Sequence, residues 1–151
     1  MAKERIGKNE RWVLIHCYLK TVERKLPDDW KLPRTISKAT MNFKYLYKSE
    51  ILLNLFNLEP FKHKIAYYYG EEYFKATGYG IWEDGNYKGF TEEQREAGLR
   101  VEKARVNYSR IKRQLINKGL IKVKRGTLNS DGIRLTNKGE LKARQLLNVN
   151  S

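Results

Sequence analysis

The chain is poor in the residues that build disulfide frameworks, metal sites and membrane spans. Its 151 residues include one cysteine, two histidines and three prolines. With Cys17 alone, no intramolecular disulfide and no multi-cysteine zinc site can form, which suits a reducing compartment. No apolar run approaches the ~20 residues of a membrane span, and the N-terminus lacks a signal-peptide core. We therefore expect a cytoplasmic protein with no metal, no cofactor and no membrane association.

Convergent catalytic chemistry is also missing from the sequence. His16 adjoins Cys17 on a predicted helix, an arrangement more typical of core packing than of a Cys-His dyad, and His63 stands alone. Adjacent acidic pairs such as Asp28-Asp29 diverge in direction, so they do not present two carboxylates to one metal. Neither a GxGxxG nor a Gly-Lys-Ser/Thr pattern occurs. We expect that the protein is not an enzyme.

Positive charge is abundant, and most of it lies at one end of the chain. The formal net charge is +14. Residues 100–151 hold 14 Lys and Arg against 3 Asp and Glu, a net of +11, whereas residues 1–99 hold 17 against 14, a net of +3. Such a localised footprint attracts phosphate backbones. We expect one compact domain in which residues 100–151 read DNA and residues 1–99 support the core and dimerisation.

Three helices are predicted in the first 58 residues. The first spans Asn9 to Lys25, because apolar and aromatic residues recur there at helical spacing. The residues on that face are Trp12, Ile15, His16, Leu19 and Val22. A second helix is expected over Ser37 to Tyr47, and a short third one over Glu50 to Leu58 with Ser49 as its N-cap. Together these segments would pack as a helical subcore.

Aromatic residues and glycines crowd the stretch 61–90. The turn residues Glu83-Asp84-Gly85-Asn86 predict a hairpin between Gly80 to Trp82 and Tyr87 to Phe90. Ile65 to Tyr69 also has strand-like residue types. The aromatic cluster is open to three interpretations, namely a second core or subunit interface, a stacking platform for single-stranded nucleic acid, and a small-ligand pocket. Its near-neutral charge favours the core or the interface.

The segment Lys103 to Lys118 predicts a helix with two distinct faces. Thr91 and Gln94 form a capping-box pattern, so a helix should begin near Glu92 and either continue or break before this segment. At about 100° per residue, an apolar stripe faces the core. The stripe contains Ala104, Tyr108, Ile111 and Leu115. The opposite face presents Val106, Ser109, Arg110, Arg113 and Asn117, with Arg105, Asn107 and Lys112 on its flanks.

The polar face of this segment has the side chains that read a major groove. Arg110 and Arg113 lie one turn apart, so both can reach one groove and pair with guanine O6 and N7. The amide of Asn107 suits adenine, and Val106 could touch a thymine methyl. A solvated basic face without a ligand is the alternative interpretation of an isolated helix of this kind.

A basic hairpin and a closing helix follow this segment. Lys118-Gly119 is a helix stop, and apolar and basic residues then alternate in two short runs around a polar loop. The inner face would hold Ile121, Val123, Ile133 and Leu135. The outer face would hold Lys122, Lys124 and Arg134, with Arg125 near the tip. These cations are placed to meet phosphates or a minor groove.

The stretch YSRIKRQLINKGLIKVKRG...DGIRLTNKGELKARQLL resembles the recognition helix, wing and following helix of bacterial winged-helix regulators, in the general style of the MarR and PadR groups. The shared features are a Ser-Arg before the apolar face, the Lys-Gly-Leu-Ile exit and the start of the next helix. That start carries Arg134, Leu135, Thr136, Lys138 and Gly139, with Thr136 as N-cap. The resemblance covers residues 103–147 and does not extend to the first 100 residues.

The expected fold is α+β, mainly α, a winged helix-turn-helix with an N-terminal helical and aromatic-rich elaboration. The expected function is sequence-specific binding of double-stranded DNA by a homodimeric repressor that occludes a promoter. The first helix, the C-terminal helix Lys138 to Leu147 and the aromatic segment are the candidate pairing surfaces. The alternatives are an RNA-binding or ribonucleoprotein accessory module, and an assembly factor of a replication or mobile-element complex. The predicted DNA-binding residues are Lys103, Arg105, Val106, Asn107, Ser109, Arg110, Lys112, Arg113, Lys122, Lys124, Arg125 and Arg134.

Overall fold

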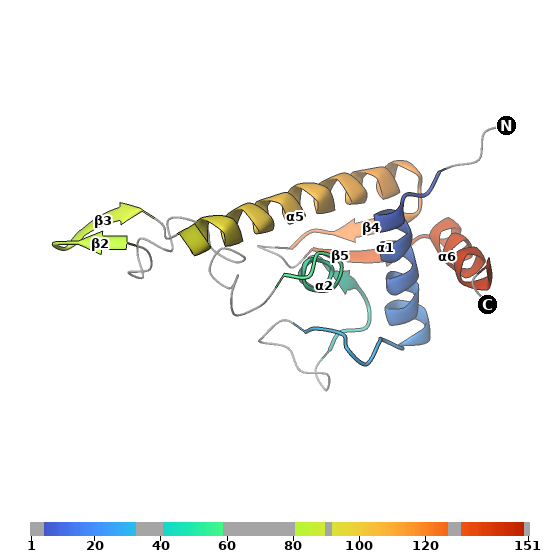
Figure 1. Cartoon of the computed structure of the whole chain (residues 1–151). Coiled ribbons are helices and arrows are strands. Elements are labelled where there is room, and N and C mark those ends of the chain that lie inside the picture. The colour runs from blue at the N-terminus through green and yellow to red at the C-terminus, as the bar shows by residue number, and fades with distance from the viewer. Residues whose placement is uncertain (1–4, 33–40, 59–80, 90–91, 127–130, 150–151) are drawn as a thin grey trace.

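Figure 1 presents the computed structural model of the chain, which describes residues 5–32, 41–58, 81–89, 92–126 and 131–149. Over these residues the fold is α+β, with four α-helices and a small antiparallel sheet of three strands. The elements are α1 (Lys8–Tyr18), the π-helical turn η1 (Leu19–Glu23), β1 (Leu46–Tyr47), α2 (Lys48–Asn54), β2 (Ile81–Glu83), β3 (Asn86–Gly89), α5 (Glu92–Asn117), β4 (Ile121–Lys124), β5 (Gly132–Leu135) and α6 (Asn137–Val149). The expected α+β class is confirmed.

The three-stranded sheet joins distant parts of the sequence. Its strand order is β1-β5-β4, and both pairings are antiparallel. Ile133 lies opposite Leu46 on one side and Val123 on the other, so a row of apolar side chains crosses the sheet. Opposed residues share one face of a sheet, and this face packs against the core. The short strand β1 thereby ties the β4–β5 hairpin to the N-terminal helices.

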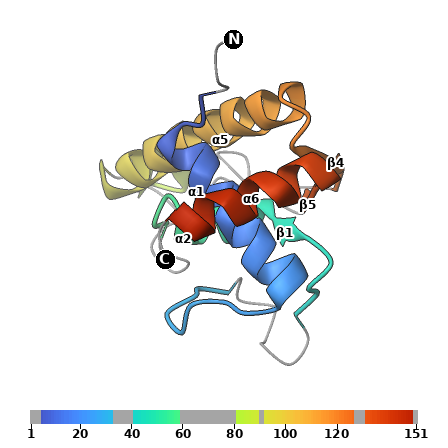
Figure 2. The same cartoon turned by 90° about the vertical axis from the view of Figure 1, so that its right-hand side faces the viewer.

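The core is built around α1, which contacts β5, α5 and α6. Figure 2 shows α6 crossing α1, so α1 is covered on more than one side. The α1 side chains that enter the core are Val13, Leu14, Cys17 and Tyr18. Each fully buried aliphatic side chain contributes about 1.5–3 kcal/mol to folding, so this helix supplies much of the driving force.

The first helix differs from the expected one in its apolar face and in its end. The helical run continues through η1 and stops at Arg24, whose φ of 56° is left-handed. The predicted apolar face is correct only in part: Trp12 packs against the core, but Val22 is 42% exposed and the other members of the face are half-buried. Those members are Trp12, Ile15, His16 and Leu19. The core takes the adjacent face because β5 and α6 approach α1 from that side.

The second predicted helix is wrong where the structure describes it. Leu46–Tyr47 form strand β1, and residues 33–40 lie outside the described residues. Tyr45, Leu46 and Tyr47 alternate, with Leu46 buried between two half-buried tyrosines. That alternation is typical of a strand. Pairing with Gly132 and Ile133 overrides the helical spacing, because the sheet supplies the hydrogen bonds that β1 needs.

The third predicted helix exists with other bounds. It begins at Lys48, earlier than expected, and ends at Asn54 rather than Leu58. Ser49 is a buried residue of its first turn, so the predicted N-cap is wrong. The backbone N–H of Tyr47, the actual N-cap, donates to Glu50 Oε1 at 3.1 Å. That glutamate satisfies a backbone donor at the start of the helix, which is the role expected of a cap partner.

The helix that begins at Glu92, as expected, runs to Asn117 without a break at Gly98. Its 26 residues span about 39 Å. Figure 1 shows the N-terminal half of α5 projecting from the core toward the β2–β3 hairpin. That hairpin is confirmed, since Asp84 and Gly85 both have positive φ, as a tight two-residue turn requires. Gly80, Phe90 and the strand-like stretch Ile65 to Tyr69 lie outside the described residues.

The junction between α5, β4 and α6 follows the expected turn chemistry. Gly119 ends α5 with a φ of +72°, and Thr136 Oγ1 accepts the N–H of Gly139 at 3.0 Å as the N-cap of α6. The Thr136 hydroxyl also donates to Gly119 O at 2.6 Å. A Cβ on Gly139 would lie 1.9 Å from the backbone oxygen of Leu120, so only glycine allows this approach. These contacts fix α6 against the start of the hairpin.

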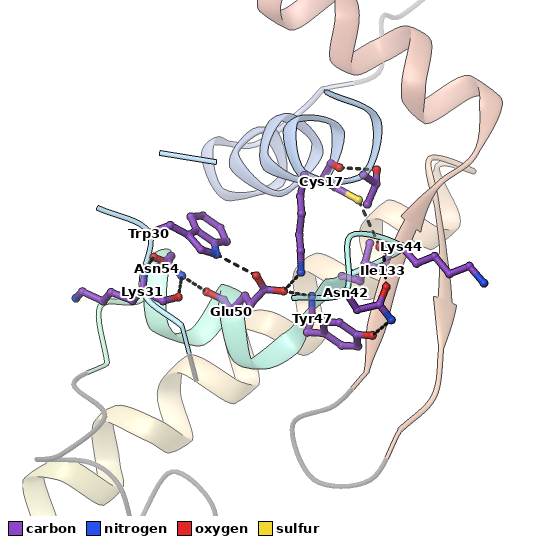
Figure 3. Close-up of polar contacts among 11 residues, drawn as sticks. Cys17, Trp30, Lys31, Asn42, Lys44, Tyr47, Glu50, Asn54 and Ile133 are labelled. Carbon is purple, nitrogen blue, oxygen red and sulfur yellow. Dashed lines mark hydrogen bonds and ion pairs between the residues drawn. The ribbon is translucent and has the colours of Figure 1, made fainter. Parts of the chain in front are cut away.

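A buried polar cluster connects η1 with α2 (Figure 3). The Lys20 ammonium and the Glu50 carboxylate form an ion pair, and both side chains are almost fully buried. Trp30 Nε1–H donates to Glu50 Oε2 at 2.9 Å. Burial lowers the pKa of Lys20, and the Glu50 charge opposes that effect. The cluster is fully hydrogen-bonded, which is the condition under which a buried charge is tolerated.

Candidate nucleic-acid interface

The two faces of α5 divide as the sequence predicts. The apolar stripe is buried, with exposed fractions of 6% or less. Its residues are Ala104, Tyr108, Ile111 and Leu115. On the opposite face Lys103, Ser109, Arg110 and Arg113 are exposed, and Val106 is 54% exposed. One side of the helix is therefore anchored, while the other presents hydrogen-bond donors and one small apolar side chain to solvent.

The flanking residues of α5 are half-buried, and they face different neighbours. Asn107 lines a groove of about 280 Å³ between α5 and the start of α1, together with Lys8, Arg110 and Gln114. Arg105 and Lys112 lie on the other flank, near the base of the β4–β5 hairpin. The groove gives Asn107 and Arg110 a common opening to solvent. Sequence reasoning did not assign Lys8 to this site, because α1 and α5 are far apart in the chain.

The β4–β5 hairpin also has the predicted faces. Ile121 and Ile133 are buried, whereas Lys122, Lys124 and Arg134 are exposed. Lys124 Nζ lies 5.6 Å and the Arg134 guanidinium carbon 5.8 Å from the centroid of the Tyr45 ring. Tyr45 lies over Gly132, because a Cβ there would come within 2.8 Å of the ring. Two hairpin cations are thus held against one aromatic ring, on the sheet face opposite to the core.

Asp131 organises the base of the hairpin. Its Oδ1 accepts the backbone N–H of Gly126 at 3.1 Å, and its Oδ2 pairs with Lys112 Nζ at 3.4 Å. Its backbone oxygen accepts the N–H of Lys48 at 2.8 Å. One residue therefore links the hairpin with α5 and α2. Arg125 is exposed beside this junction, and residues 127–130 of the tip lie outside the described residues.

The predicted residues fall into two groups. The α5 group contains Lys103, Arg105, Val106, Asn107, Ser109, Arg110, Lys112 and Arg113. The hairpin group contains Lys122, Lys124, Arg125 and Arg134. Tyr45 and Lys48 belong beside these groups and were missed by sequence reasoning. The alternation of Tyr45, Leu46 and Tyr47 is a strand pattern that could have indicated the position of Tyr45. No sequence pattern indicated the position of Lys48.

His16 and Cys17 do not form a catalytic dyad. Burial raises the pKa of the Cys17 thiol to about 12, and the thiol donates to Ile133 O at 3.4 Å. His16 Nδ1 bonds to Trp12 O at 2.8 Å, and burial lowers the pKa of the imidazole. His16 also stacks on Trp12 and Trp30. Both side chains therefore have structural partners, as expected from core packing.

The described residues also bear on two other kinds of site, a metal centre and a membrane span. No group of three His, Cys, Asp or Glu side chains lies close enough to hold a metal ion. None of the described helices is both long and apolar enough to cross a membrane. Comparisons with protein-family models, with curated proteins and with solved structures find no match to this chain.

Proposed function

We propose that the chain is a winged-helix protein that binds double-stranded DNA by sequence, as a homodimeric repressor that occludes a promoter. The order of elements supports this fold: α2 and α5 correspond to the two helices of a helix-turn-helix, and β4–β5 to the wing. The sheet order β1-β5-β4 pairs the β4–β5 hairpin with the strand that leads into α2, which supports this arrangement. One departure is the long connection between α2 and α5, where a helix-turn-helix has a short turn.

The exposed face of α5 is the observation that carries the proposal. Arg110 and Arg113 project from a helix whose opposite side is buried, so their backbone positions are fixed. A fixed helix with adjacent guanidinium groups can enter a major groove and pair with guanine edges. The hairpin cations then contact the backbone or the adjacent minor groove, which adds affinity without sequence information. The bound protein would block access of polymerase to the promoter.

Pairing of two copies would place two such helices about one helical turn apart on a pseudo-palindrome. The apolar residues of α1 are used in the core of a single chain, which leaves less of that helix for an interface. Leu141 on α6 and Leu99 on α5 are 58% and 69% exposed. The α6 helix and the N-terminal part of α5 around Leu99, outside the proposed reading face, are therefore the preferred pairing surfaces of the homodimer.

Substitution of the two arginines tests the proposal. A preferred sequence is first selected from random duplexes, and binding is then measured for Arg110→Ala and Arg113→Ala. Each change should cost about 1–3 kcal/mol and relax the preference at one base pair. Arg24→Ala is the control for the loss of one positive charge outside α5, since Arg24 is an exposed arginine after η1, and it should leave the sequence preference unchanged. Unchanged sequence preference in both α5 variants would exclude α5 as the reading helix.

A further inference from the structure

Positive charges gather where α2, α5 and the hairpin meet. Lys48 is the first residue of α2, and Arg105 and Lys112 lie two turns apart on α5. Lys48 Nζ lies 5.2 Å and Lys112 Nζ 5.5 Å from the centroid of the Tyr108 ring. All three basic side chains are half-buried. Because they are half-buried, these three like-charged side chains are held near one another. Fully exposed side chains would move apart.

Asp131 neutralises the charges of Lys48 and Lys112 only in part. Asp131 is the carboxylate that attracts Lys48, whereas Arg105 and Lys112 repel it. Burial is the largest cause that lowers the pKa of Lys48, and the two neighbouring cations add to it. The Asp131 side chain already bonds to Lys112 and to the backbone of Gly126. Lys48 and Lys112 thus share one carboxylate, the Arg105 charge adds to the repulsion of Lys48, and a bound anion would relieve this repulsion.

Tyr108 provides a second observation at the same place. The residue is 1% exposed, and its hydroxyl has no hydrogen-bond partner among the described residues. Buried hydroxyl groups nearly always have a partner, because an unsatisfied one loses its hydrogen bonds to water without replacement. A ligand that brings acceptor oxygens to the cluster would satisfy this donor as well as the cations.

We propose that Lys48, Arg105 and Lys112 form a binding site for one phosphate group, with a nucleic-acid backbone as its source. The inference rests on the proposed function, because DNA along the exposed face of α5 would pass the flank that carries Arg105 and Lys112. A phosphate held there touches α2, α5 and the hairpin together. It would set the orientation of the protein on the duplex and contribute equally to all sequences.

Lys48 is the residue to change, because its side chain lies over the Tyr108 ring and its backbone bond to Asp131 is independent of the side chain. Binding of the full chain to a random-sequence duplex is measured between about 50 and 200 mM salt. Lys48→Gln should weaken binding about tenfold at about 50 mM salt. It should also reduce the slope of log affinity against log salt concentration by about one unit. Lys48→Arg should restore binding. Lys25→Gln is the charge-matched control, and it should change affinity less than about twofold, because Lys25 is exposed beyond η1.

A second measurement separates the backbone source from free phosphate. Melting temperatures are compared in sodium phosphate and in sodium chloride at equal ionic strength. If phosphate raises the melting temperature of the wild type but not of Lys48→Gln, the phosphate site is supported without nucleic acid. This result would support the site even if the wild type did not bind duplex DNA, which would contradict the proposed function. If the wild type binds duplex DNA, and Lys48→Gln and Lys25→Gln give the same result in both measurements, the proposed phosphate site is wrong. The proposed function is not contradicted by that result.

Discussion

Two clusters of charged side chains in this protein are built in opposite ways. In the first, Lys20 and Glu50 form a buried ion pair, and the carboxylate accepts further hydrogen bonds from Trp30 and Tyr47. In the second, Lys48, Arg105 and Lys112 are half-buried, and Lys48 and Lys112 share Asp131. The first cluster is balanced in charge and closed to solvent. The second has excess positive charge and remains open to solvent.

The difference teaches how to separate structural charges from charges available for a ligand. A buried pair such as Lys20–Glu50 must be satisfied within the chain, because no solvent or ligand can reach it. An excess of cations at the surface costs stability in the free protein and is recovered only when an anion binds. Removal of one charge from the first cluster should therefore destabilise the fold, whereas removal of one cation from the second should weaken anion binding without such a loss of stability.

The largest expected effect comes from breaking the buried pair. Glu50→Leu leaves the Lys20 ammonium buried without a counter-charge and removes the acceptor of Trp30 Nε1–H. Loss of one partner of a buried pair costs about 3–5 kcal/mol. Urea denaturation followed by circular dichroism measures this loss. The double variant Lys20→Met/Glu50→Leu should recover most of it, and equal losses in the single and double variants would contradict the role assigned to the pair.

The parts of the fold that could be predicted are those determined by neighbouring residues. The faces of α5 follow from the spacing of Tyr108, Ile111 and Leu115, and the β2–β3 turn follows from Asp84 and Gly85. Gly119 ends α5 because glycine readily adopts a positive φ, and Thr136 begins α6 because its hydroxyl caps the helix. Local periodicity and turn preferences are sufficient for such elements.

The parts that could not be predicted depend on residues distant in the chain. Strand β1 has two residues and exists because it pairs with Gly132 and Ile133. Lys20 resembles a solvent-facing lysine in the sequence, and only the Glu50 carboxylate makes its burial possible. The Lys48 cluster is likewise assembled by the packing of α2 against α5. Sequence periodicity contains no information on these pairings.

A smaller effect is expected from Asp131, the counter-charge of the open cluster. Asp131→Asn keeps an oxygen for the Gly126 N–H but removes the attraction to Lys112. Duplex affinity at low salt should rise about two- to fivefold, corresponding to the ~0.5–1 kcal/mol of one partly exposed charge pair. Glu23→Gln, which removes an exposed carboxylate at the end of η1, is the control for net charge. An equal gain in both variants would mean that total charge, rather than this cluster, determines affinity.

The smallest effect should follow the loss of one hydroxyl at Tyr108. Tyr108→Phe keeps the ring that packs in the core and removes a group without a partner among the described residues, so the free energy of unfolding should stay within about 0.5 kcal/mol or rise. Tyr18→Phe is the matched comparison, because the Tyr18 hydroxyl accepts Arg144 Nε–H at 3.2 Å, and its loss should cost about 0.5–1.5 kcal/mol. Both values come from urea denaturation at one pH. A Tyr108→Phe variant destabilised as much as Tyr18→Phe would show that a group of the chain already satisfies this hydroxyl, so the hydroxyl would not be available to a bound phosphate.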